Sequence, residues 1–243
     1  MWEKQVEKTI FALNINEYSP EITALTYPLI EAYARKIGAD FHIIRERKFP
    51  EWPVTYEKLQ IYELAQQMET DWNIYIDSDC LVHPDTPDLT VMLPRDTVGL
   101  WAVDFAPLRL RPDRFFQRDG RNIGACPWLC VASNLCVDLW RPLDDLTPGE
   151  AIANISSLVV ERTSGIISPS HLLDGYVLSR NIAKYGLKFK SFRDIFIDLG
   201  FQEGGWFFYH QFMIPEKQKV IDLKKTLRAG GVDKIMGFKF ESS

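Results

Sequence analysis

The first third of the chain alternates short apolar runs with segments whose apolar residues recur every three or four positions. The runs are typical of strands buried on both faces, and the periodic segments are typical of amphipathic helices. The β-α-β-α-β order predicts a parallel sheet with right-handed crossovers, in which the loops after Ile15 and Ile76 open at the same edge. The predicted elements are a strand over 9–15, a helix over 20–37, a strand over 39–45, a helix over 56–68 and a strand over 72–76.

The first predicted helix carries clear start and stop signals. Ser19 is a natural N-cap, and Pro20 is favoured at the first helical position. Gly38 follows the last periodic residue and predicts the end of the helix. Pro28 lies inside the segment and lacks an N–H, so it is expected to kink the helix or to divide it in two.

The pattern from residue 97 onward is less regular. A predicted strand over 97–103 precedes 104–127, which is rich in Arg, Pro and Gly and predicts a long loop. Loops of this length in compact domains usually have a function, such as binding a substrate or closing over it. The rest predicts a strand over 128–138, helices over 148–163 and 168–185, strands over 187–192 and 205–210, and a basic helix over 215–228.

Composition fits one folded domain with two lobes. The chain has 243 residues, of which 46% are apolar and 13% aromatic, enough for one large shared core. Its 28 Lys and Arg against 33 Asp and Glu give a net charge of -5, which disfavours nucleic acid as a partner. The apolar run over 9–15 is too short for a membrane span and lacks the layout of a signal peptide. We therefore expect a soluble, cytoplasmic protein without a transmembrane segment.

The cysteines are too few for a disulfide scaffold in a chain of this length. No Cys-x-x-Cys pair or nearby His supports a zinc site. Buried free thiols are the favoured interpretation, and a disulfide would require an oxidising compartment. The four residues are Cys80, Cys126, Cys130 and Cys136.

The strongest candidate for chemistry is the triplet Asp77-Ser78-Asp79, directly after the predicted strand over 72–76. Open α/β sheets bind ligands at the carboxyl ends of their strands. Two carboxylates there supply the hard oxygen ligands that Mg²⁺ or Mn²⁺ prefers, and a nucleotide diphosphate commonly completes such a shell. The alternative is a turn in which the aspartates cap the loop before Pro84 and Pro87.

In combination, these features resemble the GT-A glycosyltransferases, which transfer a sugar from a nucleotide diphosphate. The resemblance covers most of the chain: the N-terminal β-α-β half, the strand-terminal Asp-x-Asp, an acid in the segment 172–176, and His210 in WFFYHQF. It implies a Rossmann-like α/β fold with a central, mostly parallel sheet flanked by helices. It also implies one GT-A domain over 1–243, with a nucleotide-sugar-binding half over 1–103 and an acceptor-binding and catalytic half over 104–243.

The resemblance implies roles for the acidic residues and for His210. Asp79 would bind the metal directly, Asp77 would bind the metal or the ribose, and His210 would supply a third protein ligand. Such an ion, Mn²⁺ or Mg²⁺, would neutralise the charge that develops on the leaving diphosphate. Asp174 would act as the catalytic base for an acceptor hydroxyl in an inverting enzyme, or would position the donor in a retaining one.

The resemblance also suggests substrate contacts. Asn14, Tyr18, Lys58, Asp77 and Ser78 would face the donor, which is expected to be a UDP-sugar. Trp101, Asp104 and Arg109, with Arg111 and Trp128 nearby, offer aromatic faces and charged groups suited to a glycan acceptor. Glycogenin-like members carry His-x-x-Gly-x-x-Lys. Here the Gly is missing and Lys217 falls one residue beyond that spacing, so no role is assigned to Lys217.

Other classes of protein remain open at this point. A haloacid-dehalogenase-like phosphatase would use Asp77 as its nucleophile, but that family requires Thr or Val where this chain has Leu81. A nucleotidyltransferase of similar fold would carry an Arg- and Gly-rich loop after its first strand, and the segment 14–19 contains neither residue. A non-catalytic sugar-binding domain would keep the aromatic residues without needing the acids. The favoured hypothesis is a metal-dependent glycosyltransferase of the hexosyltransferase type.

Overall fold

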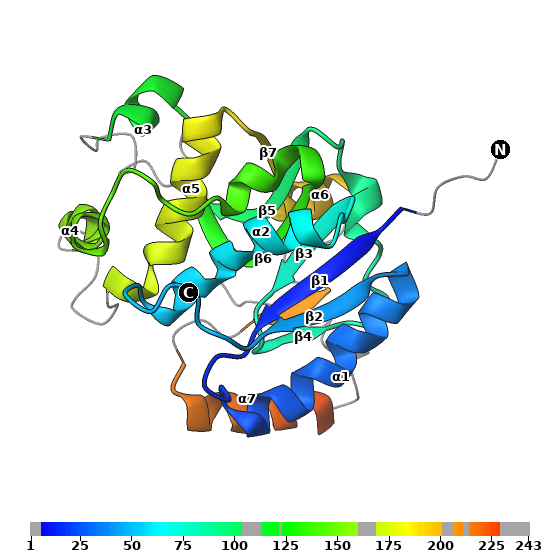
Figure 1. Cartoon of the computed structure of the whole chain (residues 1–243). Coiled ribbons are helices and arrows are strands. Elements are labelled where there is room, and N and C mark those ends of the chain that lie inside the picture. Colours follow the sequence, from blue (N-terminus) through cyan, green and yellow to red (C-terminus); the bar gives the residue numbers. More distant parts are fainter. Residues whose placement is uncertain are drawn as a thin grey trace.

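The computed structural model describes residues 6–103, 113–121, 123–159, 169–200, 207–210 and 214–228. Its centre is a six-stranded sheet with the strand order β2-β1-β3-β6-β5-β7 (Figure 1). All strands of this sheet run in one direction except β6, which is antiparallel to both of its neighbours. The strands are β1 Lys8–Leu13, β2 Asp40–Ile44, β3 Trp72–Ile76, β5 Thr97–Val103, β6 Gly124–Ser133 and β7 Lys188–Ser191.

A small second sheet pairs β4, Cys80–Val82, with β8, Phe208–His210, in antiparallel fashion.

No helix in the described part of the chain is long and apolar enough to cross a membrane. The α-helices are α1 Pro20–Ile37, α2 Ile61–Gln67, α3 Arg114–Asp119, α4 Pro148–Val159, α5 Leu173–Tyr185, α6 Phe192–Asp198 and α7 Glu216–Arg228.

Helices cover both faces of the large sheet, and α1 and α7 lie together on one side of it (Figure 1). Successive strand residues alternate between the faces, as a pleated strand requires. On β1 and β3, Ile10 and Ile74 belong to the core packed under α1 and α6. Their neighbours Phe11 and Tyr75 belong to the opposite core, under α2 and α5.

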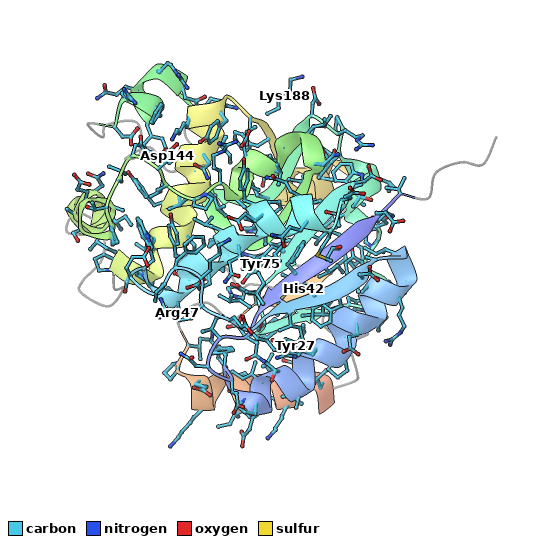
Figure 2. The ribbon with its side chains drawn as sticks, viewed as in Figure 1. Tyr27, His42, Arg47, Tyr75, Asp144 and Lys188 are labelled. Carbon is cyan, nitrogen blue, oxygen red and sulfur yellow. The ribbon has the colours of Figure 1, made fainter. Side chains whose placement is uncertain are left out.

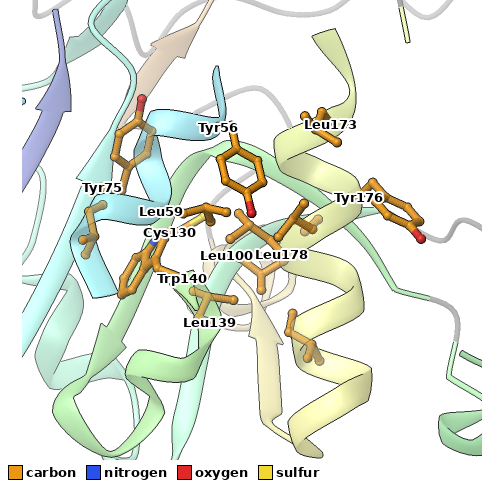
Figure 3. Close-up of a cluster of buried hydrophobic side chains, with 14 of the residues drawn as sticks. Tyr56, Leu59, Tyr75, Leu100, Cys130, Leu139, Trp140, Leu173, Tyr176 and Leu178 are labelled. Carbon is orange, nitrogen blue, oxygen red and sulfur yellow. The ribbon is translucent and has the colours of Figure 1, made fainter. Parts of the chain in front are cut away.

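The second of these cores joins distant parts of the chain. Figure 3 shows Tyr56 between the sheet and α5, facing Leu173 and Leu178. Tyr56 also stacks on Trp52, with ring centroids 4.0 Å apart, and both side chains are buried. This packing presses the amino end of α5 against the segment that carries Lys58.

The fold confirms the predicted α/β class with a central, mostly parallel sheet flanked by helices. The loops after β1 and β3 open at the same edge, as predicted: the Ser78 hydroxyl donates a 2.6 Å hydrogen bond to the carbonyl oxygen of Leu13. The α1 helix begins at Pro20 and ends before Gly38, also as predicted.

The structure bears on two expectations for α1. The helix runs unbroken through Pro28, so of the two predicted outcomes, a kink or a division, the division is wrong. Ser19 makes no side-chain cap, because its backbone is left-handed at φ 31° instead of extended, the conformation that aims a cap hydroxyl at the first turn. Its carbonyl oxygen accepts from the N–H groups of Ile22 and Thr23 instead.

Further differences concern the boundaries of elements. The predicted helix over 56–68 is a 3₁₀ helix, Val54–Gln60, followed by α2. The predicted loop over 104–127 contains α3 and the start of β6, while residues 104–112 and 122 lie outside the described part. Pro127 is tolerated in β6 because the ladder with β5 shifts register there, so its missing N–H breaks no regular pair.

The elements that follow β6 and β7 in the chain also differ from the prediction. The segment after Ser133 is a 3₁₀ helix, Asn134–Trp140, and not a continuation of the strand. The strand predicted over 187–192 ends at Ser191, and α6 begins at Phe192. Phe192 and Phe196 are one helical turn apart, and both bury their rings under β5. This packing favours a helix over a continued strand.

Candidate metal and donor site

The Asp-x-Asp triplet is held in a rigid turn at the end of β3. The N–H of Asp77 donates to the carbonyl oxygen of Trp128 on β6 at 2.9 Å, and the N–H of Cys80 donates to the carbonyl oxygen of Asp77 at 3.0 Å. Between the two acids, Ser78 is tied to α1, because its carbonyl oxygen accepts from the Thr26 hydroxyl at 2.6 Å. The backbone of the triplet is therefore fixed from three elements.

Ser78 was predicted to contact the donor, and the structure shows where its hydroxyl points. Besides donating to Leu13, the Ser78 oxygen lies 3.0 Å from the hydroxyl oxygen of Tyr27, a residue of α1 labelled in Figure 2. The side chain is 5% exposed. Ser78 thus joins the ends of β1 and β3.

His210 meets the two acids from the small sheet. In the β4–β8 ladder it lies directly opposite Cys80, the residue after Asp79. Its Nε2 is 3.5 Å from Oδ2 of Asp77 and 3.4 Å from Oδ1 of Asp79. One ligand atom from each of the three residues lies within 4.8 Å of the other two. Two carboxylate oxygens and an imidazole nitrogen so placed could hold a divalent ion such as Mn²⁺ or Mg²⁺.

Lys219 is a member of this cluster that sequence reasoning missed. It lies on α7, which packs on α1 and β4 through Val220 and Leu223, and its Nζ donates to Oδ2 of Asp79. Burial disfavours the charged form of Asp79, but His210 and Lys219 outweigh burial and hold the pKa of Asp79 well below its usual value. The basic character of the helix was visible in the sequence, but nothing there distinguished Lys219 from its neighbours.

Lys58 connects the triplet to Asp174. Its Nζ lies 2.6 Å from Oδ2 of Asp174 and 3.0 Å from Oδ1 of Asp77, and its side chain is 5% exposed. It also lies 4.8 Å from the ring centroid of Tyr75, whose hydroxyl donates to Oδ1 of Asp77 at 2.6 Å. Burial alone would lower the pKa of Lys58, but the two carboxylates more than offset it and raise that pKa.

Asp174 is buried at the start of α5 and is 2% exposed. Its Oδ2 accepts from Lys58, and its Oδ1 accepts from the N–H of Gly175 at 2.8 Å. Gly175 permits this position, because a Cβ there would lie 2.8 Å from the carbonyl oxygen of Ala125 on β6. The Asp-Gly pair is therefore explained by the close approach of α5 to the sheet.

The remaining donor candidates lie around the same sheet edge. Oδ1 of Asn14 is buried and has no hydrogen-bond partner among the described residues, although the Asn14 backbone N–H donates to Ile44 at 2.8 Å. Tyr18 is 36% exposed. Partial burial, followed by the charges of Asp79, Asp77 and Glu216, raises the pKa of the Tyr18 hydroxyl above its usual value. The ring is thus near the cluster and still accessible.

The acceptor candidates are only partly within the described structure. Trp101 and Trp128 form a pair with ring centroids 5.2 Å apart, and both are half-buried. Trp128 also stacks on His210, so the pair borders the cluster. Asp104, Arg109 and Arg111 lie outside the described residues. The four cysteines are free thiols, as expected.

Comparison with known proteins gives matches in structure and none in sequence. No protein-family model and no curated protein matches the chain. Among solved structures, a match is the crystal structure of a glycosyltransferase involved in the glycosylation of the major capsid of PBCV-1. The two share 11% sequence identity with a TM-score of 0.49, over 90% of this chain and 98% of that one. The geometry of the Asp77, Asp79 and His210 cluster stands independently of that match.

Proposed function

We propose that this protein is a divalent-metal-dependent glycosyltransferase that moves a sugar from a UDP-sugar to a hydroxyl group of a glycan. The observation that supports this function best is the convergence of Asp77, Asp79 and His210 within 4.8 Å at the carboxyl edge of the sheet. Open α/β sheets bind nucleotides at this edge. When bound, Mn²⁺ or Mg²⁺ would neutralise the negative charge on the departing diphosphate.

The uracil preference rests on Asn14. Its Oδ1 is buried and has no hydrogen-bond partner among the described residues, which is energetically unfavourable, so we propose that the amide turns toward the ligand and accepts a hydrogen bond from the base. The imide N–H of uracil is such a donor, whereas the corresponding nitrogen of cytosine carries no hydrogen. Tyr18, accessible beside the acids, offers a ring face to the base.

For Asp174 we propose that it positions the donor side of the site and does not act as a catalytic base. A base needs a carboxylate oxygen within hydrogen-bond reach of the acceptor hydroxyl. Both oxygens of Asp174 are already bonded, to Lys58 and to the N–H of Gly175, and the side chain is buried. Lys58 is bonded to the carboxylates of Asp77 and Asp174, so its influence on the donor would be indirect, through the positions of these two acids.

At the acceptor end, the Trp101 and Trp128 rings border the metal cluster and suit the apolar face of a sugar ring. Asp104 and Arg109 remain predictions for this end. The phosphatase alternative is disfavoured by the contacts of Asp77: its Oδ1 accepts from the Tyr75 hydroxyl and faces Lys58, and its Oδ2 faces His210. A cytoplasmic location also remains a prediction from the sequence.

Thermal unfolding with and without ligands tests the proposal. UDP and UDP-sugars should raise the unfolding temperature only when Mn²⁺ is present, and CDP should raise it less. A ligand at about 100 times its dissociation constant adds about 2.7 kcal/mol to the free energy of unfolding. Asp79→Ala should abolish the metal-dependent part, whereas Asp85→Ala, which removes a carboxylate that is 80% exposed outside the cluster, should not. If no nucleotide stabilises the protein in a metal-dependent way, the donor site is wrong.

A further inference from the structure

His210 is held at its backbone by few contacts. Its strand β8 has three residues and, in the described part of the chain, pairs with β4 alone. The ladder sets where the residue lies, opposite Cys80, but it does not set the rotation of the imidazole ring. Metal-binding histidines are usually oriented by a hydrogen bond to the second ring nitrogen. Among the described residues, no such bond to Nδ1 of His210 is formed, and the contact that can fix the plane of the ring there is a ring contact.

Trp128 provides that contact. Its indole ring stacks on the imidazole of His210, with centroids 5.2 Å apart and an angle of 11° between the planes. Two further rings brace the indole: Trp101 at 5.2 Å and Phe208 at 6.1 Å between centroids. The imidazole is thereby restricted to an orientation in which Nε2 faces Asp77 and Asp79.

The same residue also holds Asp77. Trp128 lies on β6 beyond the last β3–β6 pair, Ile76 with Leu129, and its carbonyl oxygen accepts from the N–H of Asp77 at 2.9 Å. One residue of the large sheet thus contacts a ligand from β3 through its backbone and a ligand from the small sheet through its ring. An imidazole that gains positive character on binding a metal is also attracted to the face of an indole.

We propose that Trp128 is a positioning residue of the metal site, which locks the small sheet's His210 onto the Asp-x-Asp turn of the large sheet. The inference rests on the metal site of the proposed function and extends it to a residue that touches no ligand atom. Removing the ring should leave both carboxylates in place and allow the imidazole to rotate away.

Titration of the full-length protein with MnCl₂ alone, followed by calorimetry, tests the effect on affinity. Trp128→Leu should weaken Mn²⁺ binding by about tenfold, the lower end of the range for residues that orient metal ligands. Trp128→Phe, which restores an aromatic face, should recover part of this loss. Phe189→Leu removes a half-buried ring on β7, the strand at the opposite edge of the large sheet from β2, and should leave Mn²⁺ affinity unchanged.

A second measurement needs no metal. In the spectrum of ¹³C-labelled histidine, the ring protons of His210, assigned with His210→Gln, should be displaced by the indole ring current and should lose that displacement in Trp128→Leu. If the Leu variant binds Mn²⁺ as tightly as the wild type, or if the His210 signals do not move, the proposal is wrong. If the wild type binds no Mn²⁺, the proposed function loses its metal site, and the histidine spectrum still decides whether Trp128 orients His210. Should Trp128→Leu fail to fold, Trp128→Phe carries both measurements.

Discussion

The polar residues of the site form one continuous series of contacts. Lys58 lies between Asp174 and Asp77, His210 lies between Asp77 and Asp79, and each carboxylate has at least one cationic or hydrogen-bonding partner, as burial of charge requires. In order of contact the groups are Asp174, Lys58, Asp77, His210, Asp79 and Lys219. Lys58 and Lys219 differ in one respect: Lys58 bonds two carboxylates, whereas Lys219 bonds only Asp79, on an oxygen that an incoming metal could use.

Lys219 should therefore compete with the metal. In Lys219→Met, the affinity for Mn²⁺ without nucleotide should rise by about tenfold, equivalent to about 1.4 kcal/mol. This is a modest part of the repulsion expected between a lysine and a divalent ion a few ångströms apart. Calorimetric titration measures it, with Lys217→Met, an exposed lysine of the same helix, as the matched control. Unchanged or weaker binding in Lys219→Met would show that the two cations do not compete.

At the scale of elements, Arg180 ties together α5, the start of α3 and the segment before α4. From α5 it bonds Asp113, the N-cap residue of α3, at 2.6 Å and both oxygens of Asp145 at 2.9 and 2.8 Å. Asp145 precedes α4, and the guanidinium carbon lies 4.7 Å from the ring centroid of Phe115. The hydrogen bonds from Arg180 outweigh partial burial and hold the pKa of Asp145 below its usual value.

This clamp should make stability depend on pH. A carboxyl whose pKa is lowered on folding contributes stability above its unfolded pKa, about 3.9, and loses it as the pH falls through the folded pKa. Denaturation midpoints at about pH 6 and about pH 3.5 should therefore differ less in Arg180→Met than in the wild type. Arg141→Met, which breaks a more exposed pair with Asp138, should behave like the wild type. Equal acid sensitivity of Arg180→Met and the wild type would rule out the clamp.

Regular elements could be predicted because their signals are local. The spacing of apolar residues gave α1 from Pro20 to Ile37 and placed β3 before the Asp triplet. The strand predicted over 205–210 contains β8. Two short elements were not predicted: β4, three residues that pair with β8, and α6, which forms because Phe192 and Phe196 pack under β5. Such elements are decided by packing and not by propensity.

At the scale of the whole molecule, the Lys58–Asp174 pair joins the first 103 residues to the rest. The two residues are 116 positions apart in the chain, and both side chains are nearly inaccessible. The large sheet also draws strands from both sides of residue 103. We therefore expect the pair to contribute to the cooperativity of unfolding as well as to the site.

A double-mutant cycle in urea denaturation tests that expectation. Lys58→Met should lower the free energy of unfolding by about 3–5 kcal/mol, because it leaves a buried carboxylate without its counter-charge. The double variant with Asp174→Asn should be more stable than the sum of the single effects, by about 1–3 kcal/mol. The exposed pair Lys48–Glu63 should show a coupling energy of less than about 1 kcal/mol. Additive effects at Lys58 and Asp174 would mean that the pair does not join the two halves.

The sequence by itself determined the α/β class and the strand that ends just before Asp77, because these depend on local periodicity. The Asp triplet was recognised from residue types suited to metal chemistry, and the roles of Asp174 and His210 were implied by the resemblance to the GT-A glycosyltransferases. Only the tertiary structure decided which cations meet those acids. Lys219 reaches Asp79 across 140 positions, and Lys58 turns toward Asp174 instead of solvent. The sequence does not show which acid a given lysine will contact. Its partner is set by the packing of α7 on α1 and of α5 on the sheet, and that packing depends on the whole chain at once.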